Sequence, residues 1–570
     1  MATELLLKEV CSTSDAVLQV LEEAGIGMVF GIAGGHTGRL FMALAKHQNA
    51  IRTVLVREES LAGVMAEIYG RLTHRPGVII GQGPWVLGNG LIGTLEAHLS
   101  SSPMLLLTDF SDNPTYNLHG PYQAGTGDYG TWNARQAFAG VTKQVFEAHD
   151  PTAGVQATQL AIKHALSGQP GPVAVLYSSG GLAGKVGPGS LPKLYRTQPY
   201  LPVQAAGAEA NAVRAAAAAI GAAKRPVIIA GNGVRIAGAF GELRAFAEAA
   251  DVPVATTASG KGTFAENHPL GLGVFGTFGI AAANAAVAEA DVVVAVGSKL
   301  GISDTARANP ALLDAARQTF VQVDIEPRNA SWTFPAEHVL VGDARVVLTQ
   351  LRDALPSSRG HAPGEARVAA FRSQHGYFDA PEYASSEKPI LPQRVIGALR
   401  RVLPDDAIVT CDAGENRILM THFYQTRSAN GFLQAAGAGP MGFGIPAALA
   451  AKLVYPERAV VAVCGDGGFA MTMNGMMTAV EQNIPIVNVV FNNKALGWVL
   501  HGGGPFAAEF EDFDHAAIAR AMKCNGIRVT DPNQLEGALR EAIASGKPTV
   551  VDVVTSLKVS YRDVTSPLAG

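Results

Sequence analysis

Cysteine is scarce in this chain of 570 residues, and its four copies are widely separated, at Cys11, Cys411, Cys464 and Cys524. This scatter provides neither a disulfide framework nor the ligand spacing of a zinc site, and we expect a cytoplasmic protein. Charged residues make up only 16% of the chain, and the net charge is -4. We expect no nucleic-acid partner, because such a partner requires a concentrated basic surface.

Long apolar runs are also absent from the sequence. No run approaches the roughly 18 residues that a membrane helix needs. The first ten residues, MATELLLKEV, combine acidic residues with a short apolar stretch and do not resemble a targeting segment. We therefore expect no association with a membrane.

Short apolar runs that alternate with helical patterns are abundant instead, and 48% of the residues are apolar. This alternation is typical of α/β folds, in which helices cover both faces of a parallel sheet. The proline-rich stretch 181–204 and the stretch 356–364 interrupt the alternation, and we expect them to be linkers. The sequence thus predicts three doubly wound parallel-sheet domains, at residues 1–185, 200–356 and 370–570. The clearest expected strands are 78–81, 104–108, 408–411 and 459–464, with the runs that begin at Pro226, Asp291 and Phe320.

The most specific pattern lies between Gly465 and Asn493, where one apolar run ends in Gly-Asp-Gly and the next ends in paired Asn. Two such runs around an amphipathic helix predict a βαβ unit that brings Asp466 and Asn493 to one sheet edge. Carboxylate and amide oxygens suit Mg²⁺, and the glycines let backbone N–H groups approach a diphosphate. A Gly-Asp-Gly alone is often only a strand-end turn, but the paired Asn favours a metal-diphosphate site.

This segment resembles the thiamine diphosphate (ThDP) motif of the family that includes acetohydroxyacid synthase, benzaldehyde lyase and pyruvate decarboxylase. The resemblance covers nearly the whole chain and implies pyrimidine-binding, central and diphosphate-binding domains, in that order. It implies that ThDP is a cofactor and that Asp466, Asn493 and the backbone carbonyl of Ala495 hold Mg²⁺. The positions that it assigns to the cofactor are Gly439, Met441, Gly465, Asp466, Gly467, Gly468, Asn493, Glu415 and Asn416. Met441 would stand beneath the thiazolium ring, unless it only packs in the core.

Glu59 stands where a predicted strand meets a helix with a face of small residues, in VLVREESLAGVMAEIYGRL. Taken alone, it would cap the helix. The segment also resembles the family's Arg-His-Glu, with Glu58 in place of His, and this implies that Glu59 hydrogen-bonds the pyrimidine of ThDP and activates it. Glu59 and Asp466 lie in different outer domains, which in this family come from two subunits. The resemblance therefore implies a homodimer at least, and we expect a homotetramer.

The residues near the reacting carbon separate the members of this family. Acetohydroxyacid synthases have Gly-x-Pro-Gly-Gly-Ala after the first strand, but here the segment reads GIAGGH and ends in His36. Benzaldehyde lyase has a His at this position, and its Leu-Gln-Ala-Gly is similar to residues 122–125, which include Gln123. We therefore expect His36 and Gln123 to be catalytic, with acid-base roles at a carbonyl oxygen. His36 could instead pack beside the glycine turn.

Four further residues are candidates for substrate contact: Trp498, His501, Gln82 and Trp85. Leu500-His501 matches a Leu-His of benzaldehyde lyase, and Trp498 would line the pocket unless it belongs to the core. Gly502 stands where the synthases have a substrate-selecting Trp. The segment GSKLGISDT, from Gly297, resembles the FAD-binding segment of the synthases only in part. We expect no FAD, although the central domain could hold it.

The predicted function is a ThDP- and Mg²⁺-dependent enzyme that makes or breaks a carbon–carbon bond next to a carbonyl group. The first candidate is a 2-keto acid decarboxylase and carboligase similar to acetohydroxyacid synthase. A benzaldehyde-lyase-like acyloin lyase and a hydrolase of a diketone are the alternatives, and a silent binding subunit is the least favoured. The expected small-molecule partners are a 2-keto acid, an aldehyde or an acyloin.

Overall fold

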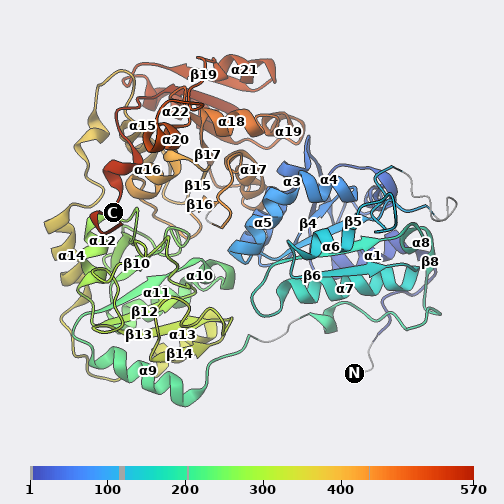
Figure 1. The fold of residues 1–570 in the computed structure, drawn as a ribbon, viewed down its shortest axis with the longest axis horizontal. Helices are drawn as coiled ribbons and strands as arrows, with labels where there is room; N and C mark the ends of the chain where they lie inside the picture. The colour runs from blue at the N-terminus through green and yellow to red at the C-terminus, as the bar shows by residue number, and fades with distance from the viewer. Residues whose placement is uncertain (1–3, 114–121, 202–204, 436, 570) are drawn as a thin grey trace. The chain divides into compact units, whose positions relative to one another are not determined.

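Three six-stranded sheets, each parallel throughout, form the framework of the protein (Figure 1). The structure is a computed structural model, and it describes residues 4–113, 122–201, 205–435 and 437–569. The chain divides into two compact units, residues 1–204 and 205–570. The first unit holds one sheet and the second holds two. The predicted fold class, three doubly wound parallel sheets, is confirmed.

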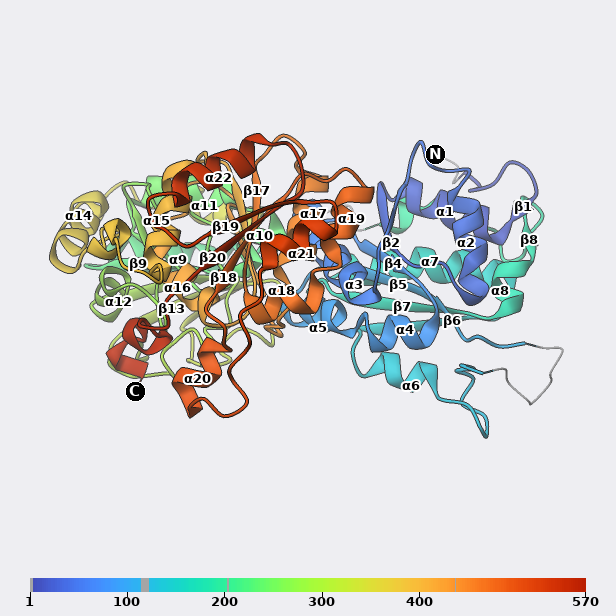
Figure 2. The ribbon, with the colours of Figure 1, turned by 90° about the horizontal axis from the view of Figure 1, so that it is seen from above.

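The sheet of the first unit has the order β3-β2-β4-β5-β7-β6, and its inner strands β4, β5 and β7 are buried on both faces. Both faces are covered because α1, α2 and α7 pack on one side and α3 and α5 on the other (Figure 2). A short antiparallel pair, β1 (Cys11–Ser12) and β8 (Lys185–Val186), lies outside the sheet. The strands are β2 (Met28–Gly31), β3 (Arg52–Leu55), β4 (Gly77–Ile80), β5 (Met104–Asp109), β6 (Gln144–Ala148) and β7 (Pro172–Tyr177). The helices are α1 (Thr13–Glu23), α2 (Gly38–Leu44), α3 (Glu59–Thr73), α4 (Gly83–Gly88), α5 (Leu91–Ser100), α6 (Ala134–Ala139), α7 (Pro151–Leu166) and α8 (Ser179–Ala183).

Helix α3 packs so closely on α5 that the backbones touch. A Cβ on Gly93 would lie 2.0 Å from the carbonyl carbon of Gly63, and a Cβ on Gly63 would lie 2.7 Å from the carbonyl oxygen of Gly90, so both positions require glycine. Arg71 ends the buried face of α3, where its guanidinium lies 2.6 Å from Glu67 and 3.0 Å from Glu96 of α5. Burial opposes the charge of these groups, but their mutual hydrogen bonds compensate for it.

The first sheet of the second unit has the order β11-β10-β9-β12-β13-β14, which is the order 3-2-1-4-5-6 of dinucleotide-binding folds. Its strands are β9 (Pro226–Ala230), β10 (Val254–Thr256), β11 (Gly271–Val274), β12 (Val292–Val296), β13 (Thr319–Asp324) and β14 (His338–Val341). Its helices are α9 (Ala210–Ala222), α10 (Asn232–Ala237), α11 (Phe240–Ala250), α12 (Ala281–Ala288), α13 (Ala344–Asp353) and α14 (Gly364–His375).

The second sheet of this unit has the order β16-β15-β17-β18-β20-β19, which is the chain order 2-1-3-4-6-5 also found in the first unit. Its strands are β15 (Ile408–Cys411), β16 (Phe432–Gln434), β17 (Val460–Gly465), β18 (Val487–Asn492), β19 (Asn525–Val529) and β20 (Thr549–Val554). Its helices are α15 (Pro392–Val402), α16 (Glu415–Phe423), α17 (Gly444–Val454), α18 (Asp466–Thr472), α19 (Gly475–Glu481), α20 (Gly497–Gly503), α21 (His515–Ala521) and α22 (Leu535–Ala544). In such sheets, ligands bind where the strand order reverses, here between β15 and β17.

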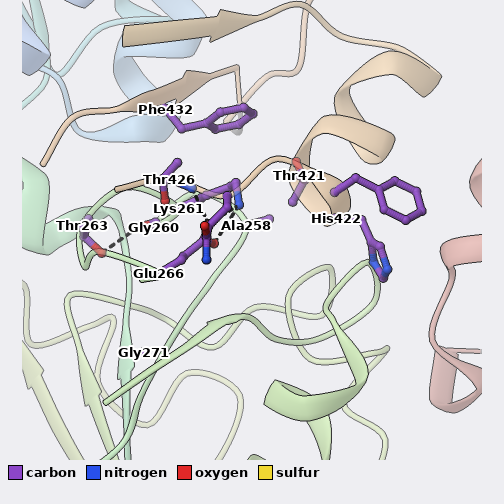
Figure 3. Close-up of polar contacts among 12 residues, drawn as sticks. Ala258, Gly260, Lys261, Thr263, Glu266, Gly271, Thr421, His422, Thr426 and Phe432 are labelled. Atoms are coloured by element: carbon purple, nitrogen blue, oxygen red, sulfur yellow. Dashed lines mark hydrogen bonds and ion pairs between the residues drawn. The ribbon is translucent and has the colours of Figure 1, made fainter. Parts of the chain in front are cut away.

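Buried polar contacts join the two sheets of the second unit (Figure 3). The ammonium group of Lys261 lies 2.7 and 2.9 Å from the two carboxylate oxygens of Glu266, and both side chains are almost fully buried. Glu266 also accepts the backbone N–H of Thr426, at 2.6 Å, from the loop before β16. Burial lowers the pKa of Lys261, and the carboxylate opposes this shift. The hydrogen bond from Thr426 to Glu266 thus ties this ion pair of the central domain to the loop before β16 of the third sheet.

The expected strands agree closely with those observed, and the segment 408–411 coincides with β15. The region between β17 and β18 differs from the single helix expected, because Met473 and Asn474 form a turn that separates α18 from α19. The domain boundaries at 1–185, 200–356 and 370–570 stay a prediction, and residues 202–204 of the expected linker lie outside the described residues. Among helices in the described ranges, none is both long and apolar enough to cross a membrane.

Candidate functional site

A cavity of about 300 Å³ opens in the second unit, at the carboxyl ends of β15, β17 and β18. It therefore lies where the strand order of the third sheet reverses. Each of the three strands contributes the residues that follow it. The lining includes Ala413, Gly414, Glu415, Asn416, Gly439, Met441, Gly465, Asp466, Gly467, Gly468, Asn493, Ala495, Leu496, Gly497 and Trp498.

Asp466 and Asn493 meet at one edge of the sheet, as their spacing predicts. β17 and β18 are adjacent and parallel, so the residue after each strand reaches the same cavity. The Asp466 carboxylate accepts the N–H of Gly467 at 2.8 Å and that of Lys494 at 2.6 Å. Burial nevertheless raises its pKa to about 6. A carboxylate held in this way is stabilised by a cation beside it.

The donor set around Asp466 fits a hard divalent cation. The described residues contain no group of three His, Cys, Asp or Glu that could hold a metal. A cation here would therefore need amide and carbonyl oxygens beside the carboxylate, and Asn493 and Ala495 can supply them. The glycines leave the room that an anion requires, because a Cβ on Gly468 would lie 2.9 Å from Asp412 and one on Gly467 3.1 Å from Met441. These residues fit a diphosphate bound with Mg²⁺.

Asp412, which follows β15, is a site residue that the sequence reasoning missed. Its buried carboxylate accepts the N–H groups of Ala413 (2.7 Å), Gly442 (2.9 Å) and Gly444 (3.2 Å). Burial raises its pKa to about 6. Through these bonds, Asp412 holds the loop that carries Gly439 and Met441 against the cavity. The sequence does carry one sign of this role, because Asp412 follows an apolar run, as Asp466 does.

Glu415 and His501 form a pair at the cavity wall. Glu415 begins α16 and lines the cavity, and its Oε1 lies 2.8 Å from Nδ1 of His501 on α20. His501 was predicted to contact substrate, but the structure places it behind Glu415, with its other ring nitrogen 3.0 Å from the carbonyl oxygen of Leu557. Trp498 lines the cavity and stacks on Tyr561 at a centroid distance of 4.0 Å. The sequence reasoning did not identify Tyr561.

Glu59 is the first residue of α3 in the first unit, and its side chain is buried. Asn89 donates a hydrogen bond to Glu59 Oε2 at 3.3 Å. The neighbouring strand β4 ends beside Glu59, since a Cβ on Gly81 would lie 4.0 Å from its Cγ. Glu59 therefore stands at the carboxyl edge of the first sheet, where the order of that sheet reverses.

His36 lies in a short 3-10 turn, η1 (Gly35–Thr37), at the same edge. Its backbone N–H donates to Asp109 Oδ2 at 2.9 Å, and its Nδ1 lies 3.7 Å from that oxygen and 3.7 Å from Asp112 Oδ1. Burial raises the pKa of Asp109, and the N–H groups of His36 and Gly83 oppose this shift. Asp109 ends β5 as Asp412 ends β15, and the sequence reasoning missed it as well.

Gln82 and Gln123 lie side by side. Gln82 donates to Gln123 Oε1 at 2.5 Å, and the indole N–H of Trp132 holds the backbone carbonyl of Gln123 at 2.8 Å. Gly35 links this pair to His36, because a Cβ on Gly35 would lie 2.9 Å from both the Gln82 amide and Asp109. The structure therefore brings together His36, Gln82 and Gln123, whereas Trp85 is 46% exposed on α4.

Three family models match the chain in succession. Residues 11–129 match the N-terminal TPP binding domain of thiamine pyrophosphate enzymes, residues 213–351 the central domain, and residues 412–553 the C-terminal TPP binding domain.

Curated relatives match over almost the entire chain. A probable acetolactate synthase large subunit of Methanocaldococcus jannaschii is 30% identical over 568 residues, which cover 95% of this chain and 91% of the relative. The acetolactate synthase isozyme 3 large subunit of Escherichia coli is 30% identical over 94% of this chain and 92% of its own length. A probable 2-ketoarginine decarboxylase of Pseudomonas aeruginosa is 30% identical over 95% of this chain and 94% of its own length.

Proposed function

Because the chain belongs to the thiamine pyrophosphate enzyme family, we propose that it is a ThDP- and Mg²⁺-dependent enzyme acting on a carbon–carbon bond next to a carbonyl group. The observation that carries this proposal is the cavity where the strand order of the third sheet reverses, with Asp466, Asn493 and the glycines at 465, 467 and 468 on its wall. We propose 2-keto acid decarboxylation followed by carboligation as the reaction. The named activities of the relatives, acetolactate synthase and 2-ketoarginine decarboxylase, support a 2-keto acid as donor.

The residues of the second unit would hold the cofactor. Asp466, Asn493 and the Ala495 carbonyl would ligate Mg²⁺, and the N–H groups of the glycines after β17 would face the diphosphate. Asp412 keeps Met441 at the cavity, where its side chain can support the thiazolium ring. When bound, ThDP supplies a nucleophilic carbon that adds to a carbonyl group and stabilises the negative charge left when the adjacent bond breaks.

The residues of the first unit would handle protons. Glu59, held by Asn89, would hydrogen-bond the pyrimidine ring of the cofactor. His36, with Asp109 and Asp112 near its ring, can exchange a proton with a substrate oxygen, and the Gln82–Gln123 pair can orient that oxygen. Because Glu59 and Asp466 belong to different units, a complete site needs both kinds of unit. We propose that two chains pair to form it, as a homodimer or a larger homo-oligomer such as a tetramer.

Product analysis tests this function. The purified enzyme, loaded with ThDP and Mg²⁺, is incubated with pyruvate and related 2-keto acids, with and without an aldehyde acceptor. We expect release of carbon dioxide and formation of a 2-hydroxyketone, or of a 2-hydroxy-3-keto acid when a second 2-keto acid is the acceptor. Absence of both products with every donor, from protein that binds ThDP, would contradict the proposed reaction.

The second candidate function, acyloin cleavage, is favoured by the contact between the His36 turn and the Gln82–Gln123 pair. If His36 handles the proton of an acyloin hydroxyl, His36→Ala should reduce cleavage and ligation by about 10² to 10⁴-fold. Decarboxylation should change little, because loss of carbon dioxide requires no proton transfer at that oxygen. Both reactions are measured on the same variant with the same donor, and equal losses would show that His36 only shapes the pocket.

A further inference from the structure

The Glu415–His501 pair at the cavity wall has a hydrogen-bond arrangement that fixes its protons. The Leu557 carbonyl, 3.0 Å from His501 Nε2, can only accept, so Nε2 carries a proton. Glu415 Oε1 lies 2.8 Å from His501 Nδ1 and already accepts the backbone N–H of Tyr561 at 2.7 Å. The His501 ring and the Tyr561 N–H group therefore both hold Oε1 in place.

The second carboxylate oxygen of Glu415 faces different surroundings. Among the described residues, Oε2 has no hydrogen-bond partner, although Glu415 lines the cavity. Gly497 leaves room in front of it, since a Cβ there would lie 2.5 Å from Oε2. Oε1 is thus occupied by the protein, and Oε2 is the oxygen that a molecule in the cavity can reach.

A carboxylate is an unexpected group in a cavity that would also hold a diphosphate. The hydrogen bonds to His501, Tyr561 and Leu557 fix the geometry of the pair. Among the described residues, the other charged or titratable groups at this wall are Arg417 on α16, Asp466 on α18 and Tyr561, which stacks on Trp498. The arrangement holds Oε1 in place and leaves Oε2 open to the cavity, as a positioned acid–base group requires.

We propose that Glu415, in place of His36, is the catalytic base and acid toward the substrate hydroxyl group, with His501 as its positioning residue; this rests on the proposed function. In the cleavage direction, the hydroxyl O–H bond breaks and the proton moves to Oε2. The electron pair left on the substrate oxygen forms the new C=O bond as the carbon–carbon bond breaks. The electron pair of the broken bond remains on the donor carbon, where bound ThDP would stabilise it. In ligation, the proton returns from Oε2 to the new alkoxide. The substrate class that needs this group is a 2-hydroxyketone, or the aldehyde and donor that combine to form one.

Glu415→Gln tests the proposal, because the amide keeps a similar shape but cannot take the proton. We expect acyloin cleavage and ligation to fall by about 10² to 10⁴-fold in kcat, with KM nearly unchanged. ThDP and Mg²⁺ should bind within about threefold of the wild-type affinity in a calorimetric titration, a readout independent of turnover. Glu536→Gln, on α22 and outside the cavity lining, is the matched control and should leave both quantities unchanged.

His501→Gln separates positioning from simple support of the fold. Without the hydrogen bond from His501, the charged form of Glu415 loses a partner, so the acidic limb of the pH–rate profile should move to higher pH. A smaller rate over the whole profile without such a movement would contradict the role of His501.

The outcomes distinguish the two proposals. Wild-type protein that fails to bind ThDP with Mg²⁺ overturns the proposed function and this inference with it. Wild-type protein that binds and turns over, with Glu415→Gln at more than about a third of its rate, overturns the inference alone. Loss of ThDP binding in Glu415→Gln also overturns it, because Glu415 would then be a cofactor ligand.

Discussion

Three buried carboxylates, Asp109, Asp412 and Asp466, stand directly at the carboxyl ends of buried strands. Burial raises the pKa of each, and backbone N–H groups provide most of the compensation. Asp412 is enclosed by the loop that it organises, whereas Asp466 faces the cavity. A cation can therefore relieve the charge of Asp466, and Asp412 must be stabilised by the protein alone.

We expect Asp412→Asn to change how stability depends on pH. Burial raises the pKa of Asp412 from 3.8 to about 6, so the folded state binds this proton more tightly than the unfolded state. The stabilising contribution is present in full below pH 3.8 and is lost as the pH rises through about 6, in total about 3 kcal/mol. The wild type should therefore lose more thermal stability between pH 5 and pH 8 than the variant.

The measurement is the unfolding midpoint of both proteins at the two pH values. Asp353→Asn, which alters an exposed carboxylate on α13, is the control and should follow the wild type. An identical pH dependence in wild type and Asp412→Asn would contradict the assignment of the raised pKa to Asp412.

Glu59→Gln should separate cofactor binding from cofactor activation. An amide can still contact the pyrimidine, but it cannot supply the proton that favours the imino form. Exchange of the ThDP C2 proton in deuterium oxide, followed by NMR, should slow by about 10² or more, with ThDP affinity nearly unchanged. Glu58→Gln, at the preceding position, is the control. An unchanged exchange rate in Glu59→Gln would assign activation to another residue.

Site residues that stand in unusual sequence patterns could be predicted. Site residues that stand in ordinary patterns could not. Asp466 lies between glycines and precedes a paired Asn by a fixed interval, so its position could be predicted. Asp412 and Asp109 are single acidic residues after apolar runs, and only the strand order shows that these strand ends border the sites. The Glu415–His501 pair joins residues 86 positions apart, and no local pattern predicts that contact.

At the scale of elements, the packing of α3 on α5 places the most stringent demand on side-chain size. Gly93→Ala should destabilise the first unit by at least about 2 kcal/mol, because the new Cβ would lie 2.0 Å from the Gly63 carbonyl carbon and the helices would have to separate. Gly88→Ala is the control, since its Cβ would meet nothing within 4 Å.

Thermal unfolding and limited proteolysis of the two variants would test this packing. The expected order of stability is Gly88→Ala near the wild type and Gly93→Ala clearly below it. If the two variants are equally stable, the contact between these helix backbones cannot be as close as the structure has it.

The strands could be predicted because a parallel strand buried on both faces gives a continuous apolar run. Their order in the sheet could not, since each sheet contains several runs of similar length and composition. The turn at Met473 and Asn474 was also missed. Both residues keep helical backbone angles, but Gly475 follows Asn474, and this Asn-Gly pair is the local signal that could have indicated the break.

At the scale of the whole molecule, the first and third sheets share one strand order, and the central sheet has another. Each of the two similar sheets presents candidate site residues at the edge where its order reverses: Glu59 and His36 in one, Asp466 and Asn493 in the other. The proposed enzyme needs both edges. For this reason we propose that two chains pair to form the site. The central claim is that the edge of the third sheet binds ThDP through a divalent cation.

Calorimetric titration with ThDP tests this claim most directly. In the presence of Mg²⁺, the wild-type protein should bind one ThDP per chain, and removal of Mg²⁺ with a chelator should abolish that binding. Asp466→Ala should lose several kcal/mol of binding free energy, about a thousandfold or more in affinity, because the diphosphate charge is no longer neutralised. Wild-type protein that binds no ThDP, or Asp466→Ala that binds it with unchanged affinity, would contradict the account.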